Sequence, residues 1–193
     1  MDCRLRSVEA LFVTSNPNKI REAAEILGIE IKNLALDLPE LQAVDVAQVA
    51  VTKAAAAREA LDDTDAFVLV EDSGLVVEAW NGLPGAFTKW FLQSVGNEGL
   101  LKMLSAYRDR SAWAVCAVAV ALPDEAVRVY LGEVEGSIAP EPRGVQGFGW
   151  DPIFVPKGDT KTYAELGALK HQDSHRARAF KAAREVLHEG LEA

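Results

Sequence analysis

The stretch "VLVEDSG", residues 68–74, runs from apolar residues typical of a buried strand directly into two adjacent carboxylates, Glu71 and Asp72. Asp, Ser and Gly favour turns, so we expect the strand to end here and a partner strand, residues 75–79, to follow across a turn at 72–74. Ligands of α/β folds bind at the carboxyl ends of strands. The pair therefore marks a candidate site, although the same residues also suit an acidic turn that bonds local backbone.

Strand and helix patterns alternate on both sides of this stretch, which indicates an α/β fold with flanking helices. Residues 10–14 are strand-like, and the apolar positions from Ile20 to Leu27 have helical spacing up to Gly28. The other predicted elements are helices at 44–61, 88–107 and 174–187, strands at 112–122, 127–138 and 153–155, and a Thr-x-x-Glu capping box at 162–165. The two long strands form an expected antiparallel hairpin, so the sheet is predicted to be mixed.

Composition predicts one ordinary globular domain, residues 1–193, with room for two lobes, since 49% of the residues are hydrophobic and 25% charged. The longest apolar run is about half of the roughly 20 residues that span a bilayer, and no signal segment opens the chain. We therefore expect a cytoplasmic protein without membrane contact. Cys3 and Cys116 are too few for a disulfide scaffold or a metal knuckle, and both are expected to be reduced thiols.

The formal net charge of −9 argues against binding to a nucleic acid polymer, which requires a broad basic surface. An anionic ligand must instead be held by local cations or by a metal. The segment "TSNPNK", residues 14–19, offers such a place. Asn16 can cap a helix that Pro17 begins, leaving free N–H groups at its positive end, and Lys19 adds a charge. An ordinary capped helix with a solvent-exposed lysine fits the same residues.

Three further groups of residues have two interpretations each. Lys53, on the alanine-rich helix, either extends to solvent or meets an anion in a cleft. The loop "GFGWDP", 147–152, either stacks its aromatics on a flat ligand, with Asp151 accepting from a ring N–H, or fills core. The segment "SHRARAF", 174–180, puts cations at a helix N-terminus, which is unfavourable unless an anion or electron-rich ligand is present; the alternative is a solvated basic turn. Glu40 alone is an acidic loop residue.

Taken together and in order, these pieces resemble the inosine triphosphate pyrophosphatase family. The matching motifs are "FVTSNPNK", "LPE", "VEDSGL", "NGLPGAFTKWF", "GFGWDPIFVP", "TYAEL" and "SHRARA", which span roughly residues 12–180. The resemblance implies a Mg²⁺-dependent hydrolase that cuts ITP, dITP or XTP between the α and β phosphates, releasing a nucleoside monophosphate and pyrophosphate and so removing deaminated purines from the nucleotide pool. It also implies an elongated, two-lobed homodimer with the nucleotide in a cleft between the lobes.

The resemblance also assigns roles to residues. Catalysis falls to Asp72, Lys19 and Lys53, and metal binding to Glu40, Asp72 and Glu71. Asp72 is expected to help hold Mg²⁺ and to orient or deprotonate the attacking water. Substrate binding falls to Thr14, Ser15, Asn16, Lys19, Ser73 and Lys89 on the phosphate side and to Phe148, Trp150, Asp151, Lys170, Ser174, His175 and Arg176 on the base side.

Base selection can be argued physically. Hypoxanthine and xanthine carry a 6-oxo acceptor that adenine lacks, so donors aimed at O6 would be left unpaired by ATP. Guanine has the same 6-oxo group, so the site must reject GTP through its 2-amino group. A donor aimed at that position, such as Arg176, would repel an amine. Asp173 departs from the family pattern, and either caps the last helix or alters the base wall. Two rival functions are a nucleotide sensor without turnover and a pyrophosphatase acting on pyrimidine or modified nucleotides.

Overall fold

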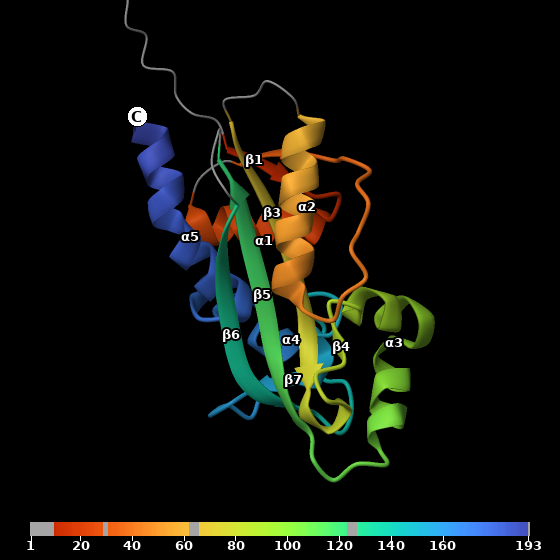
Figure 1. Ribbon diagram of the computed structural model, residues 1–193. Helices are drawn as coiled ribbons and strands as arrows, with labels where there is room; N and C mark the ends of the chain where they lie inside the picture. Colours follow the sequence, from red (N-terminus) through yellow and green to blue (C-terminus); the bar gives the residue numbers. More distant parts are fainter. Residues whose placement is uncertain (1–9, 29–30, 62–65, 123–126, 193) are drawn as a thin grey trace, which may run out of the picture.

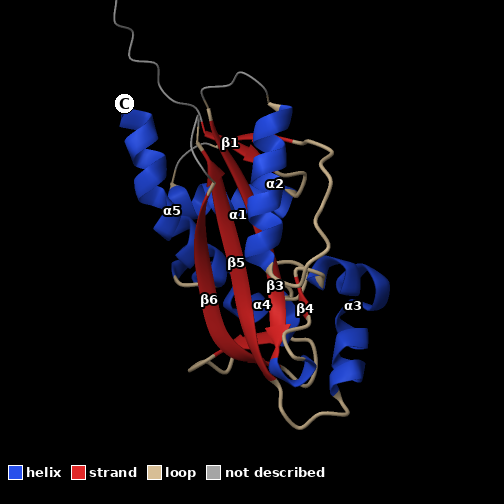
Figure 2. Ribbon diagram, in the orientation of Figure 1, coloured by secondary structure: helices blue, strands red, loops and turns tan. Residues whose placement is uncertain are grey.

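The protein is an elongated α/β molecule in which helices cover both faces of a seven-stranded mixed sheet (Figures 1 and 2). The computed structural model describes residues 10–28, 31–61, 66–122 and 127–192, with side chains to residue 187. The predicted fold class is therefore confirmed. The division of a single domain into two lobes stays a prediction.

The elements follow one another in the alternating order that the sequence indicates. They are β1 (Ala10–Val13), α1 (Pro17–Leu27), β2 (Lys32–Leu34), α2 (Val46–Ala60), β3 (Phe67–Val77), η1 (Glu78–Trp80), β4 (Pro84–Gly85), α3 (Thr88–Leu104), β5 (Ser111–Ala121), β6 (Arg128–Ile138), η2 (Asp151–Ile153), β7 (Phe154–Pro156), α4 (Tyr163–Leu166), η3 (Gly167–Gln172) and α5 (His175–Glu192). The sheet order is β2-β1-β3-β5-β6-β7, with β4 paired to β3.

The two faces of the sheet have different helical covers. Helices α1 and α5 pack on one face, where Phe12 and Phe180 meet edge to face with ring centroids 5.8 Å apart. The alanine-rich α2 packs on the other face, against β3 and β5. The alanine side chains of α2 are apolar and small, so the helix can pack close to the sheet.

Strand β3 corrects the prediction for the opening stretch. The expected turn at 72–74 is wrong, because β3 continues without a break to Val77. Its partner β5 pairs with it antiparallel from Val68↔Ala121 to Val77↔Ala112. This long ladder holds Asp, Ser and Gly extended against their local turn preference. Glu71 and Asp72 therefore lie in the middle of a strand, and as neighbours they face opposite sides of the sheet.

A gap in strand pairing explains why carboxylates occupy this part of β3. Strand β1 pairs with β3 only at Phe67–Leu69, and β4 pairs only at Leu75–Val76. Within the described sheet, Glu71–Gly74 is hydrogen-bonded to a neighbouring strand on the β5 side alone. One edge of β3 is thus open between the end of β1 and the end of the antiparallel β4 at Gly85.

Several other sequence predictions can be compared with the structure. The antiparallel pair β5–β6 and the capping box at Thr162 and Glu165 are confirmed. Helix α3 is kinked at Gly96, which has a φ of +67°. Cys116 is a buried free thiol, whereas Cys3 and the β5–β6 connection at 123–126 lie outside the described residues. In the described ranges, no helix is long and apolar enough to cross a membrane.

Candidate active site

A cavity of about 890 Å³ opens beside the one-sided stretch of β3. It is bounded by the start of α1, the loop before α2, the start of α3 and the loop at 148–151. The predicted residues that line it are Thr14, Ser15, Asn16, Lys19, Glu40, Lys53, Glu71, Asp72, Ser73, Lys89, Phe148, Trp150, Asp151, His175 and Arg176. Lys170 and Ser174 lie outside this lining. Segments far apart in the sequence are therefore brought to one cavity.

The first turn of α1 forms one wall of the cavity. Asn16 caps the helix, its side chain accepting from the Asn18 N–H at 3.0 Å, and Pro17 begins it. The Thr14 hydroxyl accepts from the Asn16 N–H at 3.1 Å, which fixes the chain as it leaves β1. The positive end of the helix dipole and its free N–H groups therefore face the cavity, an arrangement suited to an anion.

Lys19 reaches from this turn to the open edge of β3. Its Nζ lies 2.7 Å from Glu71 Oε2 and donates to the Glu71 carbonyl at 3.1 Å. Burial lowers the pKa of Lys19, but the Glu71 and Asp72 carboxylates raise it more, so the net shift is upward. Lys19 is therefore a fixed positive charge.

Asp72 has the electrostatics expected of a metal ligand or base. Its Oδ2 is buried and has no hydrogen-bond partner among the described residues. Burial raises the pKa of Asp72 to about 6, Lys19 opposes that rise, and Glu71 adds to it. A carboxylate with an unsatisfied buried oxygen fits a hard divalent cation, which would satisfy that atom.

Glu40 supplies the second carboxylate on this side. It accepts from Lys53 Nζ at 2.6 Å, and this hydrogen bond is the main cause of the lowered pKa of Glu40. No three His, Cys, Asp or Glu side chains form a metal cluster within the described ranges. Two carboxylates nevertheless suit Mg²⁺, which completes its coordination with waters and phosphates. Asp72 and Glu40 are thus the pair that would hold it.

Glu71, the third predicted metal ligand, has different partners in the structure. It is buried on the opposite face of β3 from Asp72, where it meets Lys19 and Arg176, and Cys116 Sγ donates to it at 3.1 Å. Burial raises the pKa of Glu71, but Arg176 and Lys19 outweigh that effect and hold it well below its usual range. This carboxylate is therefore ionised and engaged by cations.

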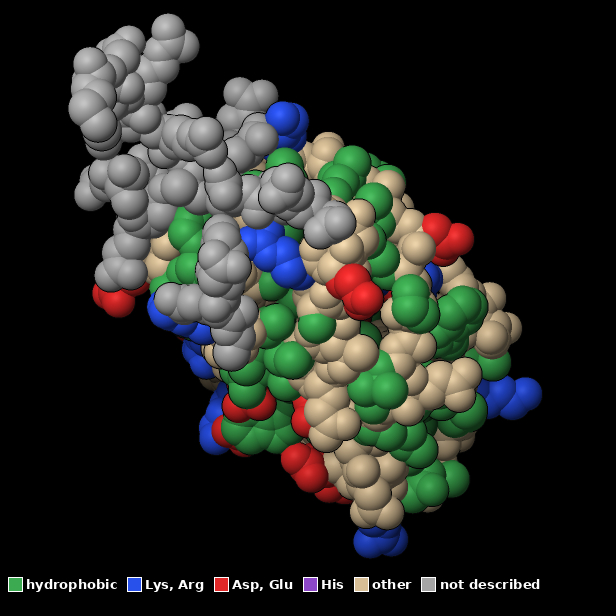
Figure 3. All heavy atoms as spheres, turned by 45° about the horizontal axis from the view of Figure 1, so that its top comes forward, with side chains coloured by type: hydrophobic (Ala, Val, Ile, Leu, Met, Phe, Trp, Pro, Cys, Tyr) green, Lys and Arg blue, Asp and Glu red, His purple; other side chains and the backbone are tan. Residues whose placement is uncertain are grey.

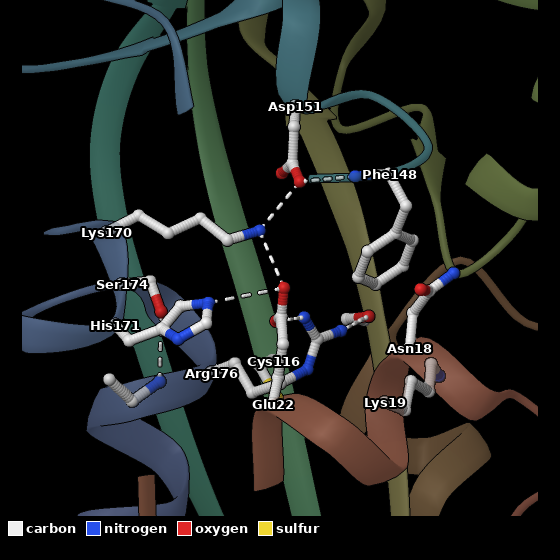
Figure 4. A network of polar contacts seen from close by, with 12 residues as sticks. Asn18, Lys19, Glu22, Cys116, Phe148, Asp151, Lys170, His171, Ser174 and Arg176 are labelled. Carbon is white, nitrogen blue, oxygen red and sulfur yellow. Dashed lines mark hydrogen bonds and ion pairs between the residues drawn. The ribbon is translucent and has the colours of Figure 1, made fainter. Parts of the chain in front are cut away.

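The opposite wall of the cavity is built on Asp151. Its Oδ2 accepts from the Phe148 N–H at 2.8 Å and lies 2.6 Å from Lys170 Nζ, which in turn lies 2.8 Å from Glu22 Oε1 (Figure 4). Positive φ values at Gly147 and Gly149 allow the loop to fold so tightly, and a Cβ at Gly147 would lie 2.1 Å from Asp151 Oδ2. Lys170 thus supports the wall from behind.

Arg176 joins the two ends of the site. Its guanidinium donates to Glu22 on α1, to Glu71 Oε1 at 3.1 Å and to Ser73 Oγ at 3.0 Å. It also lies 5.4 Å from the ring of Phe148. Burial lowers the pKa of Arg176, but its carboxylate partners raise it further above the usual range. Most of its donors are therefore engaged, whereas we expected a donor aimed at the 2-position of a base.

His175 belongs to an aromatic layer. Its ring lies parallel to Tyr163, with centroids 5.8 Å apart, and 4.9 Å from Trp150. Burial and the neighbouring Arg176 lower the pKa of His175 well below its ordinary value, so the ring is neutral at neutral pH. Both ring nitrogens lack hydrogen-bond partners within the described part of the chain. A neutral ring with free nitrogens can both stack and hydrogen-bond.

The start of α5 resolves the question about Asp173. Ser174 caps this helix, its hydroxyl accepting from the Ala177 N–H at 3.2 Å. Asp173 instead pairs with Arg178 at 2.7 Å on the surface. Of the two alternatives for Asp173, the one in which it caps the last helix is therefore wrong, because its neighbour Ser174 fills that position.

Glu22 is a residue of this network that no sequence motif predicted. It is buried and contacts Lys170, Arg176 and, less closely, His171. Residues three apart on a helix share a face, so Glu22 follows Lys19 on the same side of α1. That spacing was the signal available in the sequence. The partners of Glu22 lie 148 or more residues further along the chain, so no local pattern could reveal them.

The cavity thus combines an end suited to an anion, an unsatisfied carboxylate and an aromatic wall on an open α/β sheet. Comparison with known proteins agrees: the model of the Ham1 family matches residues 10–186, and the chain belongs to this family. It is 45% identical, over 90% of its length and 94% of the relative's, to a protein named dITP/XTP pyrophosphatase in Ignicoccus hospitalis. It is 44% identical, over 96% and 98%, to an inosine triphosphate pyrophosphatase of Yarrowia lipolytica.

Solved structures show the same relationship. The Ham1 protein of Staphylococcus aureus superposes with a TM-score of 0.80 at 31% identity, covering 94% of this chain and 98% of that one. A HAM1 protein from Coxiella burnetii gives 0.79 at 33% identity, covering 94% and 99%. The likeness therefore extends over nearly the whole of both chains.

Proposed function

We propose that this protein hydrolyses deaminated purine nucleoside triphosphates, ITP, dITP and XTP, to the nucleoside monophosphate and pyrophosphate. The observation that carries the proposal is one cavity with lysines and a helix N-terminus at one end, aromatic residues at the other, and the unsatisfied Asp72 carboxylate among the cations. Relatives of the same family named for this activity support it. A non-hydrolysing sensor would need the two ends but would have no use for a carboxylate of raised pKa.

The catalytic groups lie at the phosphate end. We propose that Asp72 and Glu40 hold Mg²⁺, which when bound neutralises phosphate charge and activates water. Asp72, ionised above about pH 6, orients or accepts a proton from the attacking water. Lys19, Lys53 and Lys89 stabilise charge that develops on the pyrophosphate leaving group, while Thr14, Ser15, Asn16 and Ser73 position the phosphates. Glu71, paired with Lys19, keeps that cation in place instead of binding metal.

Base recognition belongs to the other end. Trp150 and the neutral His175 provide ring surfaces, and Phe148 lies over the Lys170 and Arg176 cations. Since Arg176 already donates to Glu22, Glu71 and Ser73, we propose that it selects the base by keeping this wall fixed. Asp151, Lys170 and Ser174 support the same wall. Exclusion of ATP follows because donors directed at a 6-oxo group would be left unpaired by adenine.

The assembly and location are proposals as well. We propose a cytoplasmic homodimer, on the strength of the family resemblance, which light scattering on the purified protein would test. We also propose that it binds no nucleic acid polymer. Besides the net charge of −9, the lysine and arginine side chains visible in Figure 3 are interspersed with acidic and apolar ones and do not form a broad patch on that face.

The decisive experiment incubates the purified protein with Mg²⁺ and ITP, XTP, ATP, GTP or a pyrimidine triphosphate separately and identifies the products. We expect pyrophosphate and a monophosphate from ITP and XTP, with little from the others. Orthophosphate as the first product would contradict cleavage between the α and β phosphates. Tight ITP binding without turnover would favour a sensor, and faster hydrolysis of the pyrimidine substrate would favour the other rival.

A further inference from the structure

A buried hydroxyl at the start of α3 links two strands beside the cavity. Thr88 is 1% exposed, its Oγ1 accepts from the Leu75 N–H of β3 at 2.9 Å, and it donates to the Gly85 carbonyl of β4 at 2.6 Å. Leu75 and Gly85 are register partners in the β3–β4 pair. The hydroxyl thus adds two hydrogen bonds between backbones that pair directly over only two residues.

The loop that carries Glu40 is attached to the other side of Gly85. The Val44 carbonyl accepts from the Ala86 N–H at 2.8 Å. A Cβ at Gly85 would lie 2.2 Å from the Val44 carbonyl oxygen, and one at Gly74 would lie 2.0 Å from the Gly85 carbonyl oxygen. At Gly74 and Gly85, three backbone segments are therefore packed too closely to admit a Cβ, and a shift in one must move the next.

Each stacked segment carries one group of the phosphate end. Asp72 precedes Gly74 on β3 by two residues, Glu40 precedes Val44 by four residues, and Lys89 directly follows Thr88 on α3. All three side chains line the cavity. The exposed tip of the Glu40 loop is held to α2 by the Lys53–Glu40 ion pair. After Glu40, the backbone of the loop is held at Val44, whose carbonyl accepts from the Ala86 N–H. Thr88 lies where these supports meet.

We propose that Thr88 is a positioning residue whose hydroxyl sets the spacing of the Asp72 strand, the Glu40 loop and Lys89, and thereby the affinity of this end of the cavity for a divalent cation. The inference rests on the proposed function and deepens it. Thr88 is among the residues around the cavity, but its hydroxyl is bonded to the Leu75 N–H and the Gly85 carbonyl, so it acts through these two backbones. Groups hydrogen-bonded directly to metal ligands commonly alter metal affinity by about 10- to 100-fold when removed. Thr88 acts one step further back, through the backbone, so the lower end of that range is expected.

The test compares two matched variants of the full chain. Thr88→Val keeps the shape and removes the hydroxyl, whereas Thr88→Ser keeps the hydroxyl and removes the methyl group. The first measurement is the affinity for Mn²⁺ in the absence of nucleotide, detected by electron paramagnetic resonance. We expect Thr88→Val to bind Mn²⁺ about 10-fold more weakly than the wild type and Thr88→Ser to stay within about twofold. The Mg²⁺ concentration for half-maximal ITP hydrolysis should rise in parallel, with the ITP-to-GTP preference unchanged.

A purely structural role would give a different pattern. It would lower the melting temperature of Thr88→Val, measured by circular dichroism, while the folded fraction bound Mn²⁺ normally, and that result would overturn the inference. Equal losses in Thr88→Val and Thr88→Ser, or a wild type that does not bind Mn²⁺, would also overturn it. Should Thr88→Val fail to fold, Thr88→Ala makes the same loss with less bulk. Hydroxyl-dependent Mn²⁺ binding without ITP hydrolysis would contradict the proposed function alone.

Discussion

At the scale of single residues, Asp72 combines two properties that oppose each other. Its burial disfavours the charged form, and the proposed chemistry requires that form. We expect Asp72→Asn to lower kcat for ITP by at least about 100-fold while changing KM little, because the lost interaction acts mainly in the transition state. Steady-state assays with Mg²⁺ would measure this. Equal losses of binding and turnover would mean that Asp72 mainly binds substrate.

The pKa of Asp72, raised to about 6, gives this prediction a pH dependence. In the wild type, kcat/KM should fall as the pH drops through about 6 and Asp72 takes up a proton. The effect on stability has the opposite sign. Because the folded state binds this proton more tightly than the unfolded state, ionised Asp72 destabilises the fold increasingly as the pH rises from about 4 to 6. Asp72→Asn should therefore be more stable at pH 7.

The size of that gain follows from the shift of about two units, which corresponds to roughly 1–3 kcal/mol in the free energy of unfolding. Thermal and urea unfolding in metal-free buffer would measure it at pH 7 and again at pH 4. The advantage of the variant should largely disappear at pH 4. A variant less stable than the wild type at both values would show that the Asp72 carboxylate is well satisfied in the folded protein.

Individual residues also show how far sequence alone could locate the site. The cap at Asn16 and the glycine-flanked Phe148 and Trp150 are local patterns, so their positions in the cavity wall could be foreseen. Glu22 and Thr88 could not, because each acts through partners set by tertiary contact. Glu22 meets Arg176 across 154 positions of the chain. The spacing of residues within one segment cannot predict a buried pair of this kind.

At the scale of elements, α3 connects the two ends of the cavity. It begins with Thr88 and Lys89 at the phosphate end and, beyond its kink at Gly96, Asn97 donates to the Gly149 carbonyl at 2.9 Å. We expect Asn97→Ala to raise KM for ITP by about 2- to 10-fold with little change in kcat, because one hydrogen bond that holds the aromatic loop is lost.

The matched control for this helix is Glu98→Ala, which changes an exposed neighbour on α3. It should leave KM within about twofold of the wild type, as surface substitutions usually do. Steady-state kinetics with both variants would decide the matter. A loss of kcat in Asn97→Ala without a change in KM would indicate that α3 acts on the phosphate end instead.

Elements also differ in how well their sequence predicted them. The helical spacing in α1 was sufficient, because its apolar face is buried and the pattern records it. In β6 the strand itself was predicted but its buried face was not, since Val129 and Leu131 are 40% and 49% exposed whereas Tyr130 packs against the core. Strand β3 was misjudged at Asp72–Gly74, where turn-forming residues suggested an end. The pairing with β5 that keeps them extended lies more than forty positions away and outweighs their local preference.

At the scale of the whole molecule, a buried charge network ties α1, β3, η3 and α5 together through Glu22, Glu71, Lys170 and Arg176. Glu22→Ala would leave two buried cations short of a partner, so we expect the free energy of unfolding to fall by about 3–5 kcal/mol. The control on the same helix is Glu25→Ala; Glu25 pairs with His171 but its side chain is 48% exposed, and the loss should stay below about 1 kcal/mol. Urea unfolding of both variants would show whether they differ.

The same network determines what the cavity offers to an arriving nucleotide. Lys19, Lys170 and Arg176 are matched by Glu71, Glu22 and Asp151, so the interior is close to electroneutral before any ligand enters. Lys53 is likewise matched by Glu40. A bare triphosphate would thus find few uncompensated cations to offset its own charge. The affinity for the nucleotide should therefore depend on its bound metal counter-ion. The cavity should bind a metal–nucleotide complex more tightly than the free anion.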